Sequence, residues 1–164
     1  MAMQRSLQII ALGLACFPGL ALADIFDEAD ITIMEYEVSG ADLDAVSADM
    51  QQNGPQGYWA YTTWNVTWTP ECETSVTADI TMPVLADDAD LDDDEVAEFE
   101  RMADALLDHE LGHVQVGLDF AQDVAAAGCP ADVSDLHEYW LQVERDYDAE
   151  TEHGGNEGVY LDSP

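Results

Sequence analysis

One long stretch of helical periodicity constrains the fold of this chain more than any other feature. Between Asp94 and Gly128 the apolar positions recur every three or four residues: Phe99, Met102, Ala103, Leu106, Gly117, Phe120, Ala121 and Val124. This spacing predicts one amphipathic helix, about 50 Å long at about 1.5 Å per residue. Because that is long for a domain of this size, we expect a bend near Gly112 or Gly117.

The same stripe is interrupted by the sequence HELGH, which runs from His109 to His113. In a helix, residues four apart lie about 40° apart around the axis, so both imidazoles can reach one metal with Glu110 beside an open coordination position. Burying these groups is costly unless something pairs with them, and a divalent cation would pair with all three. We therefore predict a metal site. A cluster satisfied by protein partners would have to use Arg101 and Arg145.

The first residues predict a secretory signal peptide. Arg5 precedes an apolar run at residues 7–17, and the small-residue triplet Ala-Leu-Ala follows at 21–23. The predicted signal peptide is residues 1–23, and residues 24–164 are expected to form a single zinc-protease-like domain. No later segment approaches the roughly 18 apolar residues of a membrane-spanning helix. These features favour a secreted or periplasmic location.

The cysteines predict one disulfide bond. Cys16 lies inside the predicted signal peptide, which leaves Cys72 and Cys129 in the mature chain. An even pair in an exported protein is most simply explained by one disulfide. That bond would tie the strand region to the end of the HELGH helix.

The chain is strongly acidic, with 36 Asp and Glu residues against three arginines, and its formal net charge is −33. Such a charge excludes nucleic acid and anionic membrane surfaces as partners. A surface adapted to a saline environment is one explanation, and attraction of cationic substrates is another. Peptide or protein substrates remain open as partners, and nothing in the sequence indicates an oligomeric state.

The remaining periodicity predicts three strands, a short helix and a second long helix. In chain order these segments are residues 31–39 (strand), 42–51 (helix), 58–69 (aromatic strand), 73–82 (strand, stopped by Pro83) and 132–149 (helix). Strands that precede helices favour an α+β fold. We expect a small antiparallel sheet of about three strands packed on two main helices, zincin-like, with the HExxH motif on the long central helix.

A catalytic zinc needs a third protein ligand. Four residues could supply it: Asp119, His137, Glu144 and His153. The spacing of Asp119 requires a glycine where Val116 stands, and His137 is more simply explained as a packing residue. Glu144 begins an ExxxD pattern with Asp148. His153 lies in a glycine-flanked loop after a helix, so both Glu144 and His153 remain candidates.

Several segments together resemble a family of bacterial secreted proteins described as zinc-dependent proteases and catalogued as a domain of unknown function. They are YEVSG at 36–40, the turn at Gly54-Pro55, the aromatic strand at 61–68 before Cys72, HELGH, and YDAETEHG at 147–154. The last segment resembles the YDxxTxHG motif of that family. The resemblance implies His153 as the third ligand and a role nearby for Tyr147 or Asp148.

The predicted function is therefore an exported Zn²⁺-dependent metallopeptidase. Zinc would activate a water molecule, with Glu110 as the general base. Tyr147 could hydrogen-bond the developing oxyanion, or could simply pack as part of the apolar stripe of the second helix. The alternative is a non-catalytic exported binding module with a structural zinc site.

Overall fold

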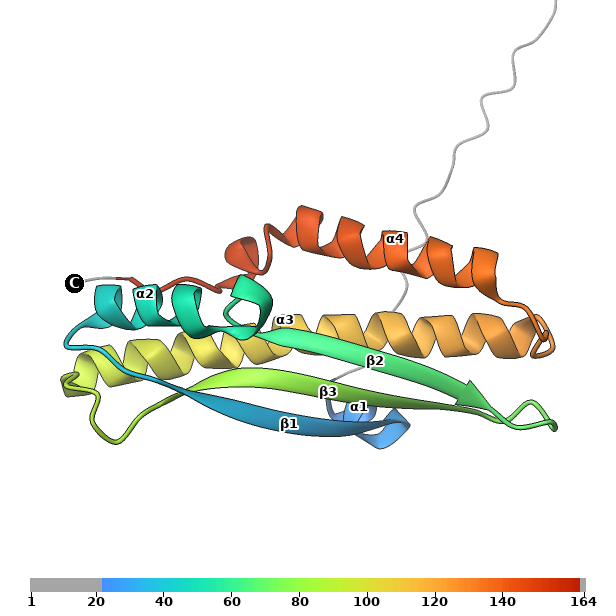
Figure 1. Cartoon of the computed structure of the whole chain (residues 1–164), viewed down its shortest axis with the longest axis horizontal. Coiled ribbons are helices and arrows are strands. Elements are labelled where there is room, and N and C mark those ends of the chain that lie inside the picture. The colour runs from blue at the N-terminus through green and yellow to red at the C-terminus, as the bar shows by residue number, and fades with distance from the viewer. Residues whose placement is uncertain (1–21, 163–164) are drawn as a thin grey trace, which may run out of the picture.

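The computed structural model describes residues 22–162 and confirms an α+β fold. Its elements are α1 (Leu22–Glu28), β1 (Ala29–Val38), α2 (Leu43–Asn53), η1 (Pro55–Gly57), β2 (Tyr61–Trp68), β3 (Thr74–Leu85), α3 (Asp93–Ala126), α4 (Ser134–Thr151) and η2 (Gly155–Glu157). The predicted long helix that carries HELGH is α3, the central helix of the molecule (Figure 1). All but the last two residues of the predicted signal peptide lie outside the described part of the chain, so that segment stays a prediction.

The sheet is mixed, which corrects the expectation of an antiparallel sheet. Its strand order is β1-β3-β2, with β3 in the centre. β2 and β3 form an antiparallel hairpin, whereas β1 runs parallel to β3. The chain crosses over through α2 and η1 after β1, and the hairpin then brings β3 back between the other two strands. Two antiparallel neighbours were expected because alternating polarity specifies a strand but not its partner.

The sequence also predicted that Pro83 would end the third strand, and this prediction was wrong. β3 continues to Leu85, and Pro83 pairs with Tyr36 of β1. The pairing of β3 with β2 extends only to Thr81. Pro83 therefore lies where β3 has a partner on one side alone, which is where a strand tolerates a residue without an N–H donor.

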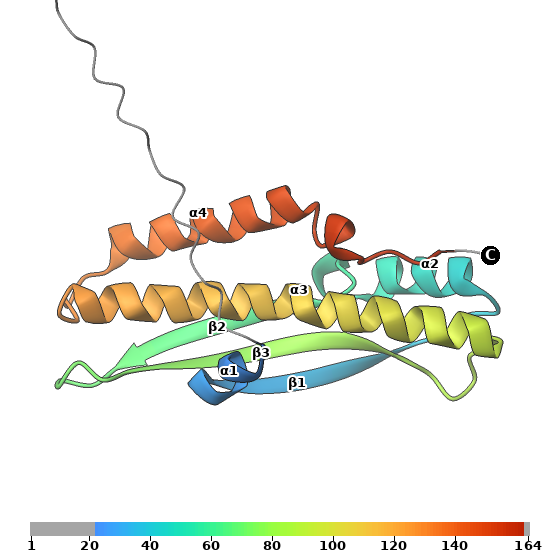
Figure 2. The same ribbon diagram turned by 180° about the vertical axis from the view of Figure 1, so that it is seen from behind.

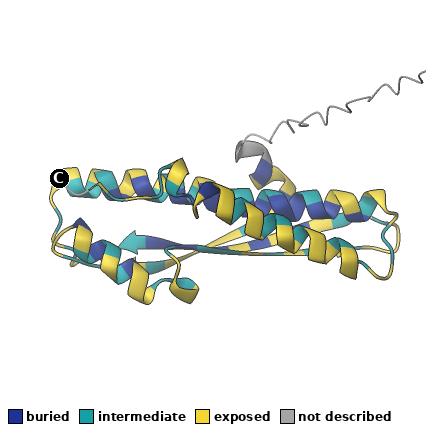
Figure 3. Ribbon diagram, turned by 90° about the horizontal axis from the view of Figure 1, so that it is seen from above, coloured by how far each residue is buried: buried dark blue, intermediate teal, exposed yellow. Residues whose placement is uncertain are grey.

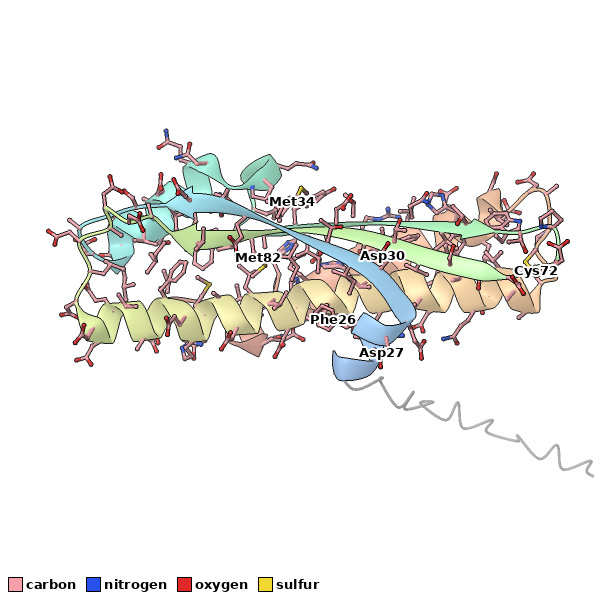
Figure 4. All side chains as sticks on the ribbon, turned by 90° about the horizontal axis from the view of Figure 1, so that it is seen from below. Phe26, Asp27, Asp30, Met34, Cys72 and Met82 are labelled. Carbon is pink, nitrogen blue, oxygen red and sulfur yellow. A yellow bond between two sulfur atoms is a disulfide. The ribbon has the colours of Figure 1, made fainter. Side chains whose placement is uncertain are left out.

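Helix α3 runs along the molecule between the sheet and α4 (Figures 1 and 2). Asp92 caps its first turn by accepting hydrogen bonds from the N–H groups of Asp94 and Glu95. The main core lies between α3 and the inner face of the sheet, and Met82 of β3 points into it (Figure 4). Seen from above, buried residues gather along α3, whereas α4 is largely exposed (Figure 3).

The predicted disulfide between Cys72 and Cys129 is present, with Cα atoms 5.5 Å apart. Cys72 lies in the turn of the β2–β3 hairpin, at the end of the sheet that adjoins the C-terminal end of α3 (Figure 4). Within residues 22–162 no helix combines the length and apolarity needed to cross a membrane. The disulfide is compatible with an extracellular location.

Candidate metal site and its cleft

The three polar residues of HELGH are buried on the face of α3 that turns toward β2 and α4. His109, Glu110 and His113 are 4%, 5% and 8% exposed. The two imidazoles meet edge to face, with ring centroids 5.1 Å apart. The i, i+4 spacing therefore brings both rings to one place, as the sequence predicted.

Each imidazole is held through its Nδ1 atom by a carboxylate from the C-terminal part of the chain. His109 Nδ1 lies 2.9 Å from Glu157 Oε2, and His113 Nδ1 lies 2.5 Å from Glu144 Oε2. The other oxygen of Glu144 accepts a hydrogen bond from the indole of Trp64. A carboxylate on Nδ1 fixes the orientation and tautomer of a histidine that binds a metal through Nε2.

Both free Nε2 atoms face the carboxylate of Asp148. Asp148 Oδ1 lies 3.4 Å from His109 Nε2 and 3.1 Å from His113 Nε2. Ligands about 2.1 Å from a tetrahedral zinc lie about 3.4 Å from one another. The three residues could therefore hold a metal ion with little rearrangement. Two imidazoles and one carboxylate are a donor set that zinc accepts.

The structure places His153 at the rim of this group. Its Nδ1 lies 3.5 Å from Asp148 Oδ1, its side chain is 59% exposed, and its ring lies against Tyr58. The prediction that His153 is the third ligand is untested; the possible metal-binding group that the structure shows is His109, His113 and Asp148. Glu144 lies on the Nδ1 side of His113 and therefore orients that ring.

The other two candidate ligands lie away from the group. Asp119 accepts a hydrogen bond from Gln115, within the same helix. His137 packs against the rings of Trp64 and Phe120, as expected of a packing residue.

Glu110 is held next to the imidazoles by a residue that sequence analysis missed. Thr62 of β2 donates its hydroxyl to Glu110 Oε2 at 2.6 Å. Burial raises the pKa of Glu110, and the hydrogen bond from Thr62 offsets part of this rise. No local pattern marks Thr62, because its role depends on the packing of β2 against α3.

The carboxylates also affect the pKa of His113. Burial alone would lower it, but the hydrogen bond and charge of Glu144 raise the pKa above its usual value. This direction describes the site without a cation. A bound metal would replace the proton and require the neutral imidazole.

Tyr147 packs behind the two histidines. Its ring stacks on His109 with centroids 5.0 Å apart, and its hydroxyl donates to the His109 carbonyl at 3.3 Å. Burial and the charge of Glu157 raise the pKa of Tyr147. A Cβ atom on Gly112 would lie 2.2 Å from the Tyr147 hydroxyl oxygen. Gly112, expected as a bend point, therefore allows α4 to approach α3.

A cleft of about 780 Å³ opens beside the group. The cleft is lined by residues of β2, α3 and α4 and of the segments next to them. They include Tyr58, Tyr61, Thr62, Trp64, His109, Glu110, His113, Leu141, Glu144, Arg145, Asp148 and His153. Strand β2 borders this cleft and is an edge strand, so its outer edge has no sheet partner within residues 22–162. The cleft can therefore bring an extended ligand next to Glu110.

The chain belongs to a family of bacterial proteins of unknown function, DUF922, whose model matches residues 33–154. The match includes HELGH and the whole YDAETEHG segment, so Glu110 and the three candidate ligands His109, His113 and Asp148 fall within the family domain. No curated protein and no solved structure matches the chain.

Proposed function

We propose that this protein is a zinc-dependent peptidase that cleaves peptide bonds in the cleft between β2 and α4. The observation that carries the proposal is the convergence of two buried Nε2 atoms on the Asp148 carboxylate, with Glu110 beside them in an open cleft. When bound, zinc supplies a Lewis acid that polarises a carbonyl and lowers the pKa of water.

In this proposal Glu110 is the general base. It takes a proton from the attacking water and passes it to the leaving amine. In the site without a cation, burial raises the pKa of Glu110, and a carboxylate with a raised pKa is a stronger base for the first step. Thr62 keeps the carboxylate in one orientation. Tyr147, which was considered as an oxyanion donor, points to the His109 carbonyl and is better suited to hold that ligand in place.

The substrate would lie along β2. An extended peptide can pair with a free strand edge through its main chain, and this pairing requires no particular side chains. Tyr58 and Tyr61 stack near the start of β2 and line the cleft. This arrangement supports a peptide as the substrate class.

The second candidate function is a binding module with a structural metal. It would require a coordination sphere closed by protein groups. Glu144 is engaged by His113 and Trp64, and His153 is mostly exposed, which favours an open site. A third possibility is that the carboxylates satisfy two charged imidazoles without any metal. Glu144, Asp148 and Glu157 would then be the partners of the imidazoles, in place of the Arg101 and Arg145 partners expected from the sequence.

Metal analysis of the disulfide-bonded protein separates these functions. We expect about one zinc per wild-type chain, a large loss in Asp148→Ala and a smaller one in His153→Ala. Asp146→Ala is the matched control, because it removes an exposed acidic residue from the same helix. A wild-type protein that takes up no zinc would exclude both the peptidase and the structural-metal function.

Activity separates the first two functions. Mass spectrometry of a mixed peptide library should show cleavage by the zinc-loaded wild type. Glu110→Gln should keep its zinc and lose at least about 100-fold in rate. Retention of zinc by a wild type that cleaves nothing would favour the structural module.

A further inference from the structure

We infer that Arg145 recognises a carboxylate of the substrate, and that the cleft prefers peptides with a free C-terminus shortly after the cleaved bond. The inference rests on the proposed function and adds a substrate class to it. It begins from the charges around the cleft.

Arginine is scarce in this chain, and the two arginines among residues 22–162 have different environments. Arg101 forms an ion pair with Glu98 and donates to the carbonyls of Gly158 and Tyr160. Arg101 thereby attaches the C-terminal segment to α3. The guanidinium of Arg101 is therefore engaged within the protein and is not available to bind a ligand.

Arg145 has no acidic partner of this kind. Its Nε and Nη2 both donate to the amide oxygen of Gln142, at 3.2 and 2.7 Å. Within the described residues it forms no ion pair, although Glu144 and Asp146 are its sequence neighbours. Those two carboxylates are engaged elsewhere, Glu144 by His113 and Asp146 by the Gln142 amide group. Among the described residues, the guanidinium therefore has a neutral partner and no paired carboxylate.

Arg145 is one of the residues that line the cleft, and it lies on the same helix as Asp148. Arg145 precedes Asp148 by three residues on α4, a rise of about 4.5 Å along the helix axis. One residue of an extended peptide spans about 3.4 Å. A carbonyl placed at the metal would therefore leave the carboxylate one or two residues later within reach of the Arg145 side chain.

The electrostatics of the cleft make this position selective. Glu110, Glu144 and Asp148 would repel a substrate carboxylate elsewhere in the cleft. Arginine pairs with carboxylates in a bidentate geometry, and such charged hydrogen bonds are the stronger ones. The same cleft is also lined by Leu141, Trp64 and His137, which offer an apolar surface for the last side chain of the peptide.

The test uses binding, so that it does not depend on turnover. The probes are N-acetyl-Leu-Phe with a free carboxylate and the same peptide as its C-terminal amide. Calorimetry on zinc-loaded Glu110→Gln protein should show about 10- to 100-fold tighter binding of the acid. In the Glu110→Gln/Arg145→Gln double variant, the affinity for the acid should fall to that for the amide. Zinc content should stay the same.

The matched control is Gln122→Glu in the same background, which changes the net charge by the same amount at an exposed position on α3. It should keep the preference for the acid. A preference that survives Arg145→Gln would overturn the inference, because the carboxylate would then be bound by the metal alone. Equal affinity for acid and amide, or no binding of either at millimolar concentration, would also overturn it.

A third probe, N-acetyl-Leu-Asp-amide, identifies the source of the carboxylate. Tight binding that depends on Arg145 would support the recognition of acidic side chains, and weak binding would support a free C-terminus. The proposed function fails separately, if the wild type holds no zinc or if cleavage does not depend on Glu110. Equal binding of acid and amide by the protein with Arg145 intact, together with bound zinc and cleavage that depends on Glu110, would leave a peptidase without this specificity.

Discussion

Helices α3 and α4 face each other across the candidate metal site, but different forces hold them in place. α3 buries fourteen residues, whereas Thr151 is the only buried residue of α4. α4 is instead attached by polar and aromatic contacts. Glu144 contacts His113 and Trp64, Trp140 donates to Asp123 at 3.0 Å, and Tyr147 stacks on His109.

The comparison shows that the site itself attaches α4. Several of the contacts between the two helices involve a candidate metal ligand or a residue that orients one. α3 supplies two of the candidate metal ligands, His109 and His113, and its position is stabilised by the hydrophobic core. α4 supplies the third candidate ligand, Asp148, and the position of α4 depends on its polar contacts with the site. Metal binding and the docking of α4 should therefore be coupled.

The largest expected effect on stability comes from the core under α3. Met102 is fully buried, so Met102→Ala should lower the free energy of unfolding by about 2–5 kcal/mol. Leu141 of α4 is 39% exposed, and Leu141→Ala should cost less than about 1 kcal/mol. Urea denaturation of the two variants measures both. Equal losses would show that α4 is also held by apolar burial.

Gly112→Ala should separate the two helices without weakening α3. Alanine favours a helix by about 1 kcal/mol over glycine, but its Cβ would lie 2.2 Å from the Tyr147 hydroxyl. The Tyr147 ring, which stacks on His109, or α4 itself would have to move, and zinc affinity should fall about 100-fold or more, as measured by chelator competition. Gly155→Ala is the control, since its Cβ would meet only an ordinary contact at 3.6 Å. Unchanged zinc affinity in Gly112→Ala would contradict the close packing.

Metal removal should loosen α4 and leave α3 intact. After treatment with a chelator, the amides of α4 should exchange hydrogen about tenfold faster or more, because the bound state no longer holds this helix. The amides of α3 around Val114 lie in the core and should keep their protection. Hydrogen exchange followed by mass spectrometry resolves the two helices. A uniform change in both would rule out a coupling specific to α4.

Loss of an orienting carboxylate should weaken metal binding less than loss of a ligand. Glu144→Gln and Glu157→Gln should each lower zinc affinity by about 10- to 100-fold. Glu144 should have the larger effect, because its side chain is 19% exposed against 38% for Glu157. Glu150→Gln, an exposed change on α4, is the control. A larger effect at Glu157 would reverse the expected order.

The smallest effect concerns the attachment of the C-terminal segment to α3. The hydrogen bond from Arg101 lowers the pKa of Glu98 from 4.5 to about 2. A carboxylate whose pKa is lowered by folding stabilises the folded state at pH values above its ordinary pKa of 4.5. This stabilisation is lost as the pH falls toward about 2. Glu98→Gln should therefore melt below the wild type at neutral pH, and the difference should close between about pH 5 and pH 2. A difference in melting temperature that does not change with pH would show that Glu98 acts through packing and not through its charge.

The sequence by itself determined the two long helices, α2, the three strands and part of the site, but not the short helix α1. The period of the apolar residues identified α3, α4 and the three strands, because burial of one face leaves a local pattern. The i, i+4 spacing placed His109 and His113 together for the same reason. The pairing of Cys72 with Cys129 followed from there being no other cysteine outside the predicted signal peptide.

Only the tertiary structure decided which strands pair in parallel and which residues distant in the sequence lie beside His109 and His113. The parallel pairing of β1 with β3 depends on a crossover, and no residue pattern within either strand encodes it. Asp148 is one of 36 acidic residues, and its position opposite both imidazoles depends on how α4 packs against α3. The same holds for Thr62, Glu157 and Arg145. A local pattern reports which face of an element is buried, but the contacts of that face depend on the rest of the chain.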